Sequence, residues 1–193
     1  MDLQLAYKHK IILGSSSPRR QQLLKDAGFE FVTNPINADE SFPANLQAEQ
    51  ISLYLCEKKA NAFPGKLQEG EVLITADTIV WVDNIVLNKP ADEFEAKQML
   101  SLLSDKMHRV FTGVCLTTNK NKISFTDETK VYFKTLTEAE ISFYIKNYKP
   151  FDKAGSYGAQ DWLGLVAIDK IEGSYFNVMG LPVHKVYEEL CKL

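Results

Sequence analysis

The sequence has few cysteines, few histidines and no long apolar run, and each shortage excludes a class of protein. Its three cysteines, Cys56, Cys115 and Cys191, lie far apart without a C-x-x-C pair, which excludes a disulfide framework and a zinc or redox motif. Their apolar neighbours are typical of buried reduced thiols in a reducing compartment. No segment approaches the roughly 18 apolar residues of a membrane span, and residues 1–10 lack the apolar core of a signal peptide. A cytoplasmic protein without a membrane partner is expected.

An excess of positive charge is also missing. The 22 Lys and Arg residues are balanced by 25 Asp and Glu residues, so the net charge is −3 and no overall basic field attracts nucleic acid. Aromatic residues are scattered without basic residues between them, which favours core packing over stacking on nucleobases. No nucleic-acid partner is expected, and any anion site must be built locally. The length of 193 residues fits one domain, or two closely joined lobes with a shared core.

The order of apolar runs and turn residues predicts a mixed α/β fold. Short apolar runs predict strands at residues 11–13, 29–33, 72–75, 79–82, 85–87, 110–118, 123–136 and 163–168. Amphipathic stripes with capping residues, such as Thr137-x-x-Glu140, predict helices at residues 18–27, 46–63, 92–103, 137–148 and 182–190. Asp83-Asn84 between two strand runs predicts the turn of a hairpin. Residues 34–45 are too polar for a regular element and are predicted to form a surface loop that carries acids. Because hairpins interrupt the alternation of strands and helices, we expect a mixed twisted sheet flanked by helices.

The strongest local feature is the junction I-I-L-G-S-S-S-P-R-R between the first strand and the first helix. The first turn of a helix offers unpaired N–H groups and the positive end of the helix dipole. Serine hydroxyls and the guanidinium groups of Arg19 and Arg20 lie against this turn, and arginine matches phosphate oxygens bidentately. The junction is therefore a candidate phosphate site, although it lacks the G-K-[ST] of a Walker loop. The alternative is a helix capped by Ser17, with solvated arginines.

Asp77 lies between two strand-like runs, where a carboxylate is costly unless it has a partner. The alternative is an aspartate that caps a turn. A dehalogenase-type nucleophile would need a second aspartate two positions later, and Ile79 stands there. No histidine pairs in the sequence with a serine or cysteine nucleophile, so a catalytic triad is not supported.

Three lysines and one acid carry no specific signal when each is taken alone. Lys58 and Lys59 are typical of a solvent-exposed helix face. Lys89 is typical of a loop charge whose position Pro90 fixes, and Glu40 belongs to the acidic loop. Together they match what a triphosphate site needs when no single loop holds all the phosphates. Such a site has cations on several segments, beside acids that can hold Mg²⁺.

Five separated motifs resemble the Maf family of nucleoside triphosphate pyrophosphatases over about Ile11 to Leu190. They are Ser15-x-Ser17-Pro18-Arg19-Arg20, Ala76-Asp77-Thr78, Lys89-Pro90, Asp152-Lys153-Ala154-Gly155-x-Tyr157-Gly158-x-Gln160, and Gly173-Ser174-Tyr175 with Gly180-Leu181-Pro182. This sequence departs from the family pattern at two positions. Gly14 replaces an alanine before the serines, and Asp161 replaces a small residue after Gln160.

The resemblance implies hydrolysis of a nucleoside triphosphate between the α and β phosphates, with a divalent cation such as Mg²⁺ or Mn²⁺. It implies a single two-lobed domain over residues 1–193 with a central cleft, similar to inosine triphosphate pyrophosphatases. Such proteins are often homodimers. Members are also associated with inhibition of septum formation, so a nucleotide-binding regulator of cell division with secondary hydrolysis is the alternative function. A phosphate-binding nucleic-acid module is disfavoured by the negative net charge.

The resemblance also assigns roles to individual residues. The catalytic set is Glu40, Lys59, Asp77 and Lys89, with Glu40 and Asp77 as metal ligands. The substrate-binding set is Ser15, Ser17, Arg19, Arg20, Thr78, Lys153 and Gln160. Asp77 corresponds to the general base, and whether it acts as base or as metal ligand stays open. Arg19, Thr78 and Gln160 are linked to base choice, and Gln160 after Tyr-Gly-x resembles the branch that acts on dTTP and UTP. The amide of Gln160 could meet N3–H and O4 of uracil or thymine together, which disfavours cytosine.

Overall fold

The computed structural model describes residues 7–193, which form two compact units. Unit 1 comprises the described residues up to Asp77 together with Thr112–Asp127 and Gly180–Leu193, and unit 2 comprises Thr78–Phe111 and Glu128–Met179. The first six positions of the N-terminal stretch examined for a signal peptide lie outside the described residues. No helix in the described part of the chain is long and apolar enough to cross a membrane.

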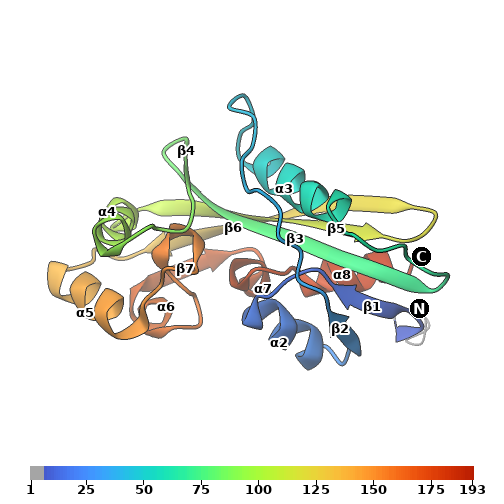
Figure 1. Ribbon diagram of the computed structural model, residues 1–193. Coiled ribbons are helices and arrows are strands. Elements are labelled where there is room, and N and C mark those ends of the chain that lie inside the picture. The colour runs from blue at the N-terminus through green and yellow to red at the C-terminus, as the bar shows by residue number, and fades with distance from the viewer. Residues whose placement is uncertain (1–6) are drawn as a thin grey trace. The chain divides into compact units, whose positions relative to one another are not determined.

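The predicted mixed α/β architecture is confirmed (Figure 1). The strands are β1 (Lys10–Leu13), β2 (Phe31–Thr33), β3 (Glu71–Val82), β4 (Ile85–Leu87), β5 (Met107–Thr117), β6 (Lys122–Phe133) and β7 (Ile168–Glu172). The helices are α2 (Pro18–Asp26), α3 (Glu49–Asn61), α4 (Glu93–Leu103), α5 (Glu138–Tyr148), the 3₁₀ turn η1 (Ala154–Ser156), α6 (Trp162–Ala167), α7 (Tyr175–Met179) and α8 (Val183–Leu190). The sheet order is β2-β1-β3-β5-β6-β7, and β4 pairs with β3. Parallel and antiparallel pairs occur together, as expected.

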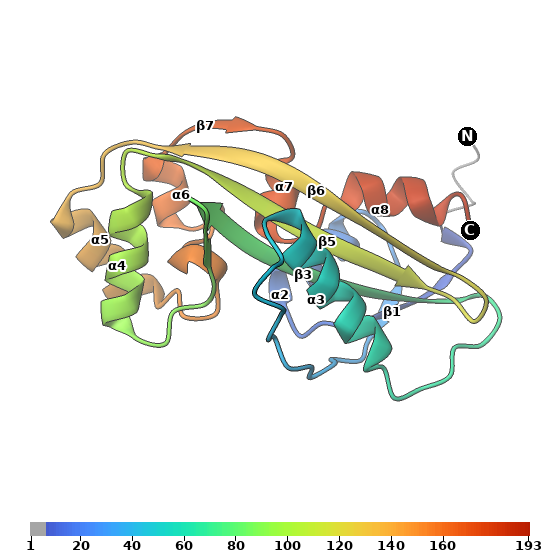
Figure 2. The same ribbon diagram turned by 90° about the horizontal axis from the view of Figure 1, so that it is seen from above.

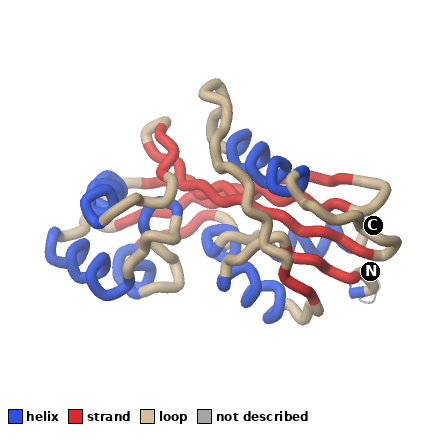
Figure 3. The backbone as a smooth tube through the Cα atoms, in the orientation of Figure 1, coloured by secondary structure: helices blue, strands red, loops and turns tan. Residues whose placement is uncertain are grey.

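In unit 1 the chain adds strands on both sides of its first strand, β1. β1 pairs in parallel with β2 on one side and with β3 on the other. Helix α2 leads from β1 to β2, and α3 leads back to β3. Because right-handed crossovers in opposite directions lie on opposite faces of a sheet, α2 and α3 cover different faces (Figures 1 and 2). Figure 3 shows residues 34–48 as irregular chain between β2 and α3, and this stretch includes the acidic loop predicted at residues 34–45.

One glycine allows α3 to lie close to its sheet. A Cβ atom built on Gly113 of β5 would stand 2.3 Å from the carbonyl oxygen of Ser52, a distance that no real contact reaches. The α3 backbone therefore rests almost directly on the strand. Beside this contact, Cys56, Cys115 and Ala60 form a small buried cluster, and both cysteines are buried free thiols, as predicted. The free Cys191 near the C-terminus is only half-buried, so the prediction of burial is wrong for it.

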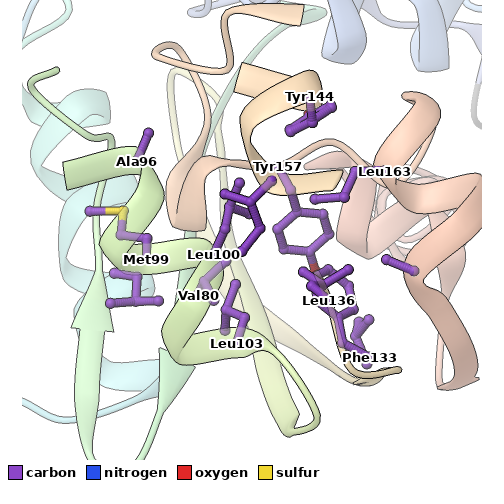
Figure 4. Close-up of a cluster of buried hydrophobic side chains, with 14 of the residues drawn as sticks. Val80, Ala96, Met99, Leu100, Leu103, Phe133, Leu136, Tyr144, Tyr157 and Leu163 are labelled. Atoms are coloured by element: carbon purple, nitrogen blue, oxygen red, sulfur yellow. The ribbon is translucent and has the colours of Figure 1, made fainter. Parts of the chain in front are cut away.

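Unit 2 has its own apolar core. Buried residues of α4, α5 and α6 pack with strand residues around Tyr157, and Figure 4 shows Leu100 and Leu163 beside this ring. The capping box predicted at the start of α5 is present, because the Thr137 hydroxyl accepts from the Glu140 N–H while the Glu140 side chain accepts from the Thr137 N–H. The predicted hairpin at Asp83 and Asn84 is also present, and both turn residues have positive φ, as a type I′ turn requires.

One strand prediction is wrong, and the interruption predicted between two other strands does not occur. The strand predicted at 163–168 is helix α6, and β7 begins only at Ile168. Leu163 and Ala167 are buried while Leu165 is 78% exposed, a spacing that buries one face of a helix. Strands 72–75 and 79–82 are parts of one continuous strand, β3, so Ala76-Asp77-Thr78 does not interrupt it.

Candidate active site

The turn after β1 brings three segments of unit 1 together. Leu13 pairs with Ile74 of β3, and the N–H of Gly14 donates to the carbonyl oxygen of Ile74 at 2.8 Å. A Cβ atom on Gly14 would lie 2.8 Å from both Ile36 Cδ1 and Thr75 Cγ2. Gly14, which departs from the family pattern, therefore fits the small space left beside Ile36 of the acidic loop and Thr75 of β3.

The serine turn is organised by Ser15 rather than by Ser17. Ser17 stands at the N-cap position of α2, but its side chain makes no capping bond, so the predicted cap is wrong in this respect. Instead, the buried Ser15 hydroxyl accepts from the Ser17 N–H at 3.2 Å and from Arg20 Nη1 at 3.3 Å. Pro18 begins the helix as predicted, and Arg19 follows it in the first turn.

Arg20 is anchored at both ends of its guanidinium group. Its Nε donates to the carbonyl oxygen of Gly180 at 2.8 Å, in addition to the bond from Nη1 to Ser15. Burial lowers the pKa of Arg20, and the negative charge of Asp77 opposes this shift. Because an arginine pKa starts far above neutrality, the group keeps its charge. Arg20 is therefore held by hydrogen bonds within the protein, and the alternative of a solvated arginine is wrong for this residue.

We call Glu40, Lys59 and Asp77 the acid–lysine cluster. Lys59 Nζ lies 2.5 Å from Asp77 Oδ1 and 3.1 Å from Glu40 Oε1. The side chains of Lys59 and Asp77 are 12% and 10% exposed, whereas that of Glu40 is 47% exposed. Lys59 is therefore not on a solvated helix face, and Asp77 does not cap a turn. Both alternatives from the sequence are wrong.

The register of β3 against α3 explains this cluster. Thr75 faces α3, because its hydroxyl donates to the carbonyl oxygen of Cys56 at 2.8 Å. Side chains alternate along a strand, so Asp77 returns to the same face two residues later. One helical turn of α3 advances from Cys56 to Lys59 over a similar distance. The close approach at Gly113 brings α3 onto β5, the strand next to β3 in the same sheet.

The adjacent lysine of α3 holds the acidic loop. Lys58 Nζ lies 2.9 Å from Asp39 Oδ2 and donates to the carbonyl oxygen of Ser41 at 2.8 Å. Hydrogen bonds from Ser41 and then from Lys58 lower the pKa of Asp39 to about 2. Two neighbouring lysines thus bind two neighbouring acids, and Lys58 fixes the residues on both sides of Glu40.

The remaining predicted site residues lie in unit 2. Thr78 directly follows Asp77 in β3, and Lys89 is an exposed residue beside the buried Pro90. Lys153 Nζ lies 2.7 Å from Asp152 Oδ1 and 3.7 Å from Asp161 Oδ2. The convergence of these residues with the acid–lysine cluster stays a prediction.

We call residues 158–161 the glutamine segment. The Oε1 atom of Gln160 is buried and has no hydrogen-bond partner among the described residues. A Cβ atom on Gly158 would lie 2.8 Å from Gln160 Nε2, so the glycine makes room for the amide. An orphaned buried acceptor is rare in folded proteins and calls for a specific cause, such as a ligand that supplies the donor.

The residues that hold this segment were not predicted from the sequence. The hydroxyl of Tyr144 accepts from the Gly158 N–H at 3.1 Å and donates to Asp161 Oδ2 at 2.9 Å. The buried ring of His108 lies 2.7 Å, Nε2 to hydroxyl, from Tyr157. In the sequence, Tyr144 belongs to the apolar stripe of a predicted helix, so it was expected in the core. Its hydroxyl was the one sign in the sequence of a polar role.

A sequence model described as Maf-like protein matches residues 10–193, so the chain belongs to the Maf family. A protein named dTTP/UTP pyrophosphatase from Phocaeicola vulgatus is 50% identical over 96% of this chain and 97% of its own length. One of the same name from Flavobacterium johnsoniae is 50% identical over 96% of each chain. The structure of the Staphylococcus aureus Ham1 protein covers 64% of this chain and 71% of its own, with 12% identity and a TM-score of 0.44, too low to support an argument.

Proposed function

We propose that this protein is a nucleoside triphosphate pyrophosphatase that hydrolyses dTTP and UTP to the monophosphate and pyrophosphate. The observation that carries the proposal is the acid–lysine cluster, in which a largely buried lysine joins two carboxylates from separate segments. The names of its relatives in the Maf family support the same substrates.

The phosphate chain would bind to the cations of unit 1 and to the N-terminal turn of α2. Arg20 is already oriented by Ser15 and Gly180, so little side-chain freedom is lost when an anion binds. Lys59 lies within reach of both acids and neutralises part of the charge that develops on the phosphates. Lys89 and Lys153 stay predicted substrate contacts, on the resemblance to the family.

The two acids also fit a divalent cation. Glu40 and Asp77 approach one ammonium group, so their carboxylate oxygens already share a space that a small positive charge occupies, and Mg²⁺ is usually bound by one or two carboxylates plus phosphates. No group of three or more His, Cys, Asp or Glu residues that could hold a metal occurs within residues 7–193. A bound Mg²⁺ or Mn²⁺ would supply Lewis-acid stabilisation of the phosphoryl oxygens.

Asp77 accepts the proton of the attacking water in this mechanism. The water oxygen bonds to the α phosphorus, and the bond from this phosphorus to the α–β bridging oxygen breaks, so that pyrophosphate leaves. A positioned base of this kind contributes about 100- to 10,000-fold to the rate.

Gln160 would select the base. Its orphaned Oε1 can accept the N3–H of uracil or thymine, while its amide N–H donates to O4. Cytosine presents the reverse pattern and leaves polar groups unpaired, at about 1 to 3 kcal/mol each. Preference for UTP over CTP is therefore expected to be at least about tenfold.

The test measures pyrophosphate release with Mg²⁺ across all common nucleoside triphosphates. We expect turnover of dTTP and UTP above that of CTP and of the purines. Asp77→Asn should lose about 100- to 10,000-fold in kcat while remaining folded. Preference for a purine would remove Gln160 from base selection, and undiminished turnover of the variant would mean that another base operates. Tight nucleotide binding without steady turnover would favour the regulator instead.

A further inference from the structure

The hydroxyl of Tyr144 lies inside the apolar core of unit 2. The side chain is fully buried on the inner face of α5 among the residues around Leu100 and Leu163 (Figure 4). A phenylalanine would fill the same volume of core without a polar atom. A buried hydroxyl is costly unless it is hydrogen-bonded, so the destination of its bonds indicates what it does.

Both bonds of this hydroxyl go to the glutamine segment, one on each side of Gln160. The Gly158 N–H donates to the hydroxyl at 3.1 Å, two residues before Gln160, and the hydroxyl donates to Asp161 Oδ2 at 2.9 Å, one residue after it. Burial, followed by the charge of Asp161, raises the pKa of Tyr144, so the hydroxyl remains a neutral donor at physiological pH. A single oxygen atom thus clamps the backbone and the side chain that flank the amide.

The clamp is attached to a rigid support. Helix α5 begins in a complete capping box, and Tyr144 stacks on Tyr148 with ring centroids 5.2 Å apart. Asp161 also lies 3.7 Å from Lys153 Nζ, so the clamp reaches a second proposed substrate contact.

The amide of Gln160 is confined by the same residues. An added Cβ atom on Gly158 would lie 2.8 Å from Gln160 Nε2 and 2.7 Å from Asp161 Oδ2, so amide and carboxylate both lie close above this glycine. A shift of either flanking residue would move the orphaned Oε1. An amide reads a base only while its acceptor and donors keep their places, because a rotated amide presents the reverse pattern.

We propose that Tyr144 is a positioning residue for base discrimination, whose hydroxyl holds the glutamine segment so that the Gln160 amide keeps one orientation. This inference rests on the proposed function. Tyr144 does not touch the substrate. Its loss therefore alters the choice between bases more than the rate of phosphoanhydride cleavage, which depends on residues of unit 1.

The test compares Tyr144→Phe with Tyr148→Phe, a matched change one helical turn away on an exposed tyrosine. The readouts are kcat and KM for UTP and for CTP, together with the melting temperature. In Tyr144→Phe we expect the UTP-over-CTP ratio of kcat/KM to fall about tenfold, mainly through a higher KM for UTP, with kcat changed less than about threefold. Tyr148→Phe should keep the wild-type ratio. An unchanged ratio in Tyr144→Phe, or an equal loss in Tyr148→Phe, would overturn the proposal.

A second pair of variants covers a failure of Tyr144→Phe to fold. Asp161→Ala removes the acceptor of the tyrosine bond and should lower the ratio in the same direction, whereas Asp161→Asn keeps an oxygen acceptor and should restore most of it. Equal ratios in the two variants would contradict the clamp. If the wild-type protein turns over no pyrimidine triphosphate, the proposed function itself fails. Wild-type turnover of UTP with an unchanged ratio in the variants overturns only the role of Tyr144.

Discussion

The acid–lysine cluster of unit 1 and the glutamine segment of unit 2 differ in the chemical groups that hold them in place. The cluster joins charged groups, Glu40, Lys59 and Asp77, and presents two of them from regular elements, β3 and α3. The glutamine segment is irregular chain, and the neutral hydroxyl of Tyr144 holds it by bonds to its first N–H and to its last side chain. Charges act over distance and tolerate small errors of position, whereas recognition by hydrogen bonds depends on distance and angle. The comparison teaches that holding a polyphosphate and choosing a base need different kinds of support.

The largest effect is expected from the two neighbouring lysines of α3. Lys59→Met should lower kcat/KM for UTP by about 100-fold or more, because it removes a preorganised charge beside Asp77. Lys58→Met should cost less than about tenfold, mainly in KM, because Lys58 only holds the loop on either side of Glu40. Steady-state kinetics of both variants decide the matter. Equal losses would show that α3 supplies a general positive field rather than one placed charge.

The next effect concerns two glycines that allow close backbone contacts, one in each unit. Gly113→Ala and Gly164→Ala should each lower the free energy of unfolding by about 2 kcal/mol, because the new methyl group meets the backbone of Ser52 or of Ala159. Urea denaturation measures this loss. Beyond stability, Gly113→Ala should lower kcat by displacing Lys59, and Gly164→Ala should lower the UTP-over-CTP ratio.

Gly70→Ala serves as the control for both glycine variants. Apart from its two chain neighbours, no atom of residues 7–193 lies within 4 Å of the added Cβ, and φ is +81°, so only the backbone penalty of about 1 kcal/mol is expected. If all three variants behave alike, close contact is not the reason for Gly113 and Gly164.

A further effect is a dependence of stability on pH that arises in unit 2, small near neutral pH and growing as the pH falls. Burial lowers the pKa of His108 from 6.5 to about 3, so the folded protein keeps this ring neutral beside Tyr157. As the pH falls below 6.5, the unfolded chain takes up a proton that the folded chain does not, and stability declines by up to about 1.4 kcal/mol per pH unit. His108→Gln cannot take up this proton. Urea midpoints at about pH 4 to 7 should therefore fall less steeply for the variant, and parallel curves would count against the assignment.

Local signals in the sequence predicted much of the fold. The apolar run of β1, the turn at Asp83 and Asn84, and the capping box at Thr137 each depend on residues within one or two turns of chain. The errors arose where distant partners decide the outcome. Asp77 stays inside a strand because Lys59 lies above it, and residues 162–167 form a helix because that spacing buries Leu163 and not Leu165.

The site residues divide in the same way, into those that adjacent residues predict and those that distant partners bring together. The serine turn could be recognised from adjacent residues, but the grouping of Glu40, Lys59 and Asp77 came only from the resemblance to a family. Their meeting depends on the register of α3 on the sheet, which the spacing of side chains along the chain does not encode. The role of Tyr144 was hidden because its ring obeys the apolar pattern. The predicted homodimer and cytoplasmic location stay predictions.

The missing side chain at Gly14 has a consequence for protein engineering. The space that a methyl group would need there is already filled by Ile36 and Thr75, which come from different parts of the chain. An alanine introduced at position 14 should therefore lower the free energy of unfolding, because Ile36 and Thr75 must shift to admit it, and a smaller residue at 36 or 75 in the same variant should restore part of the loss.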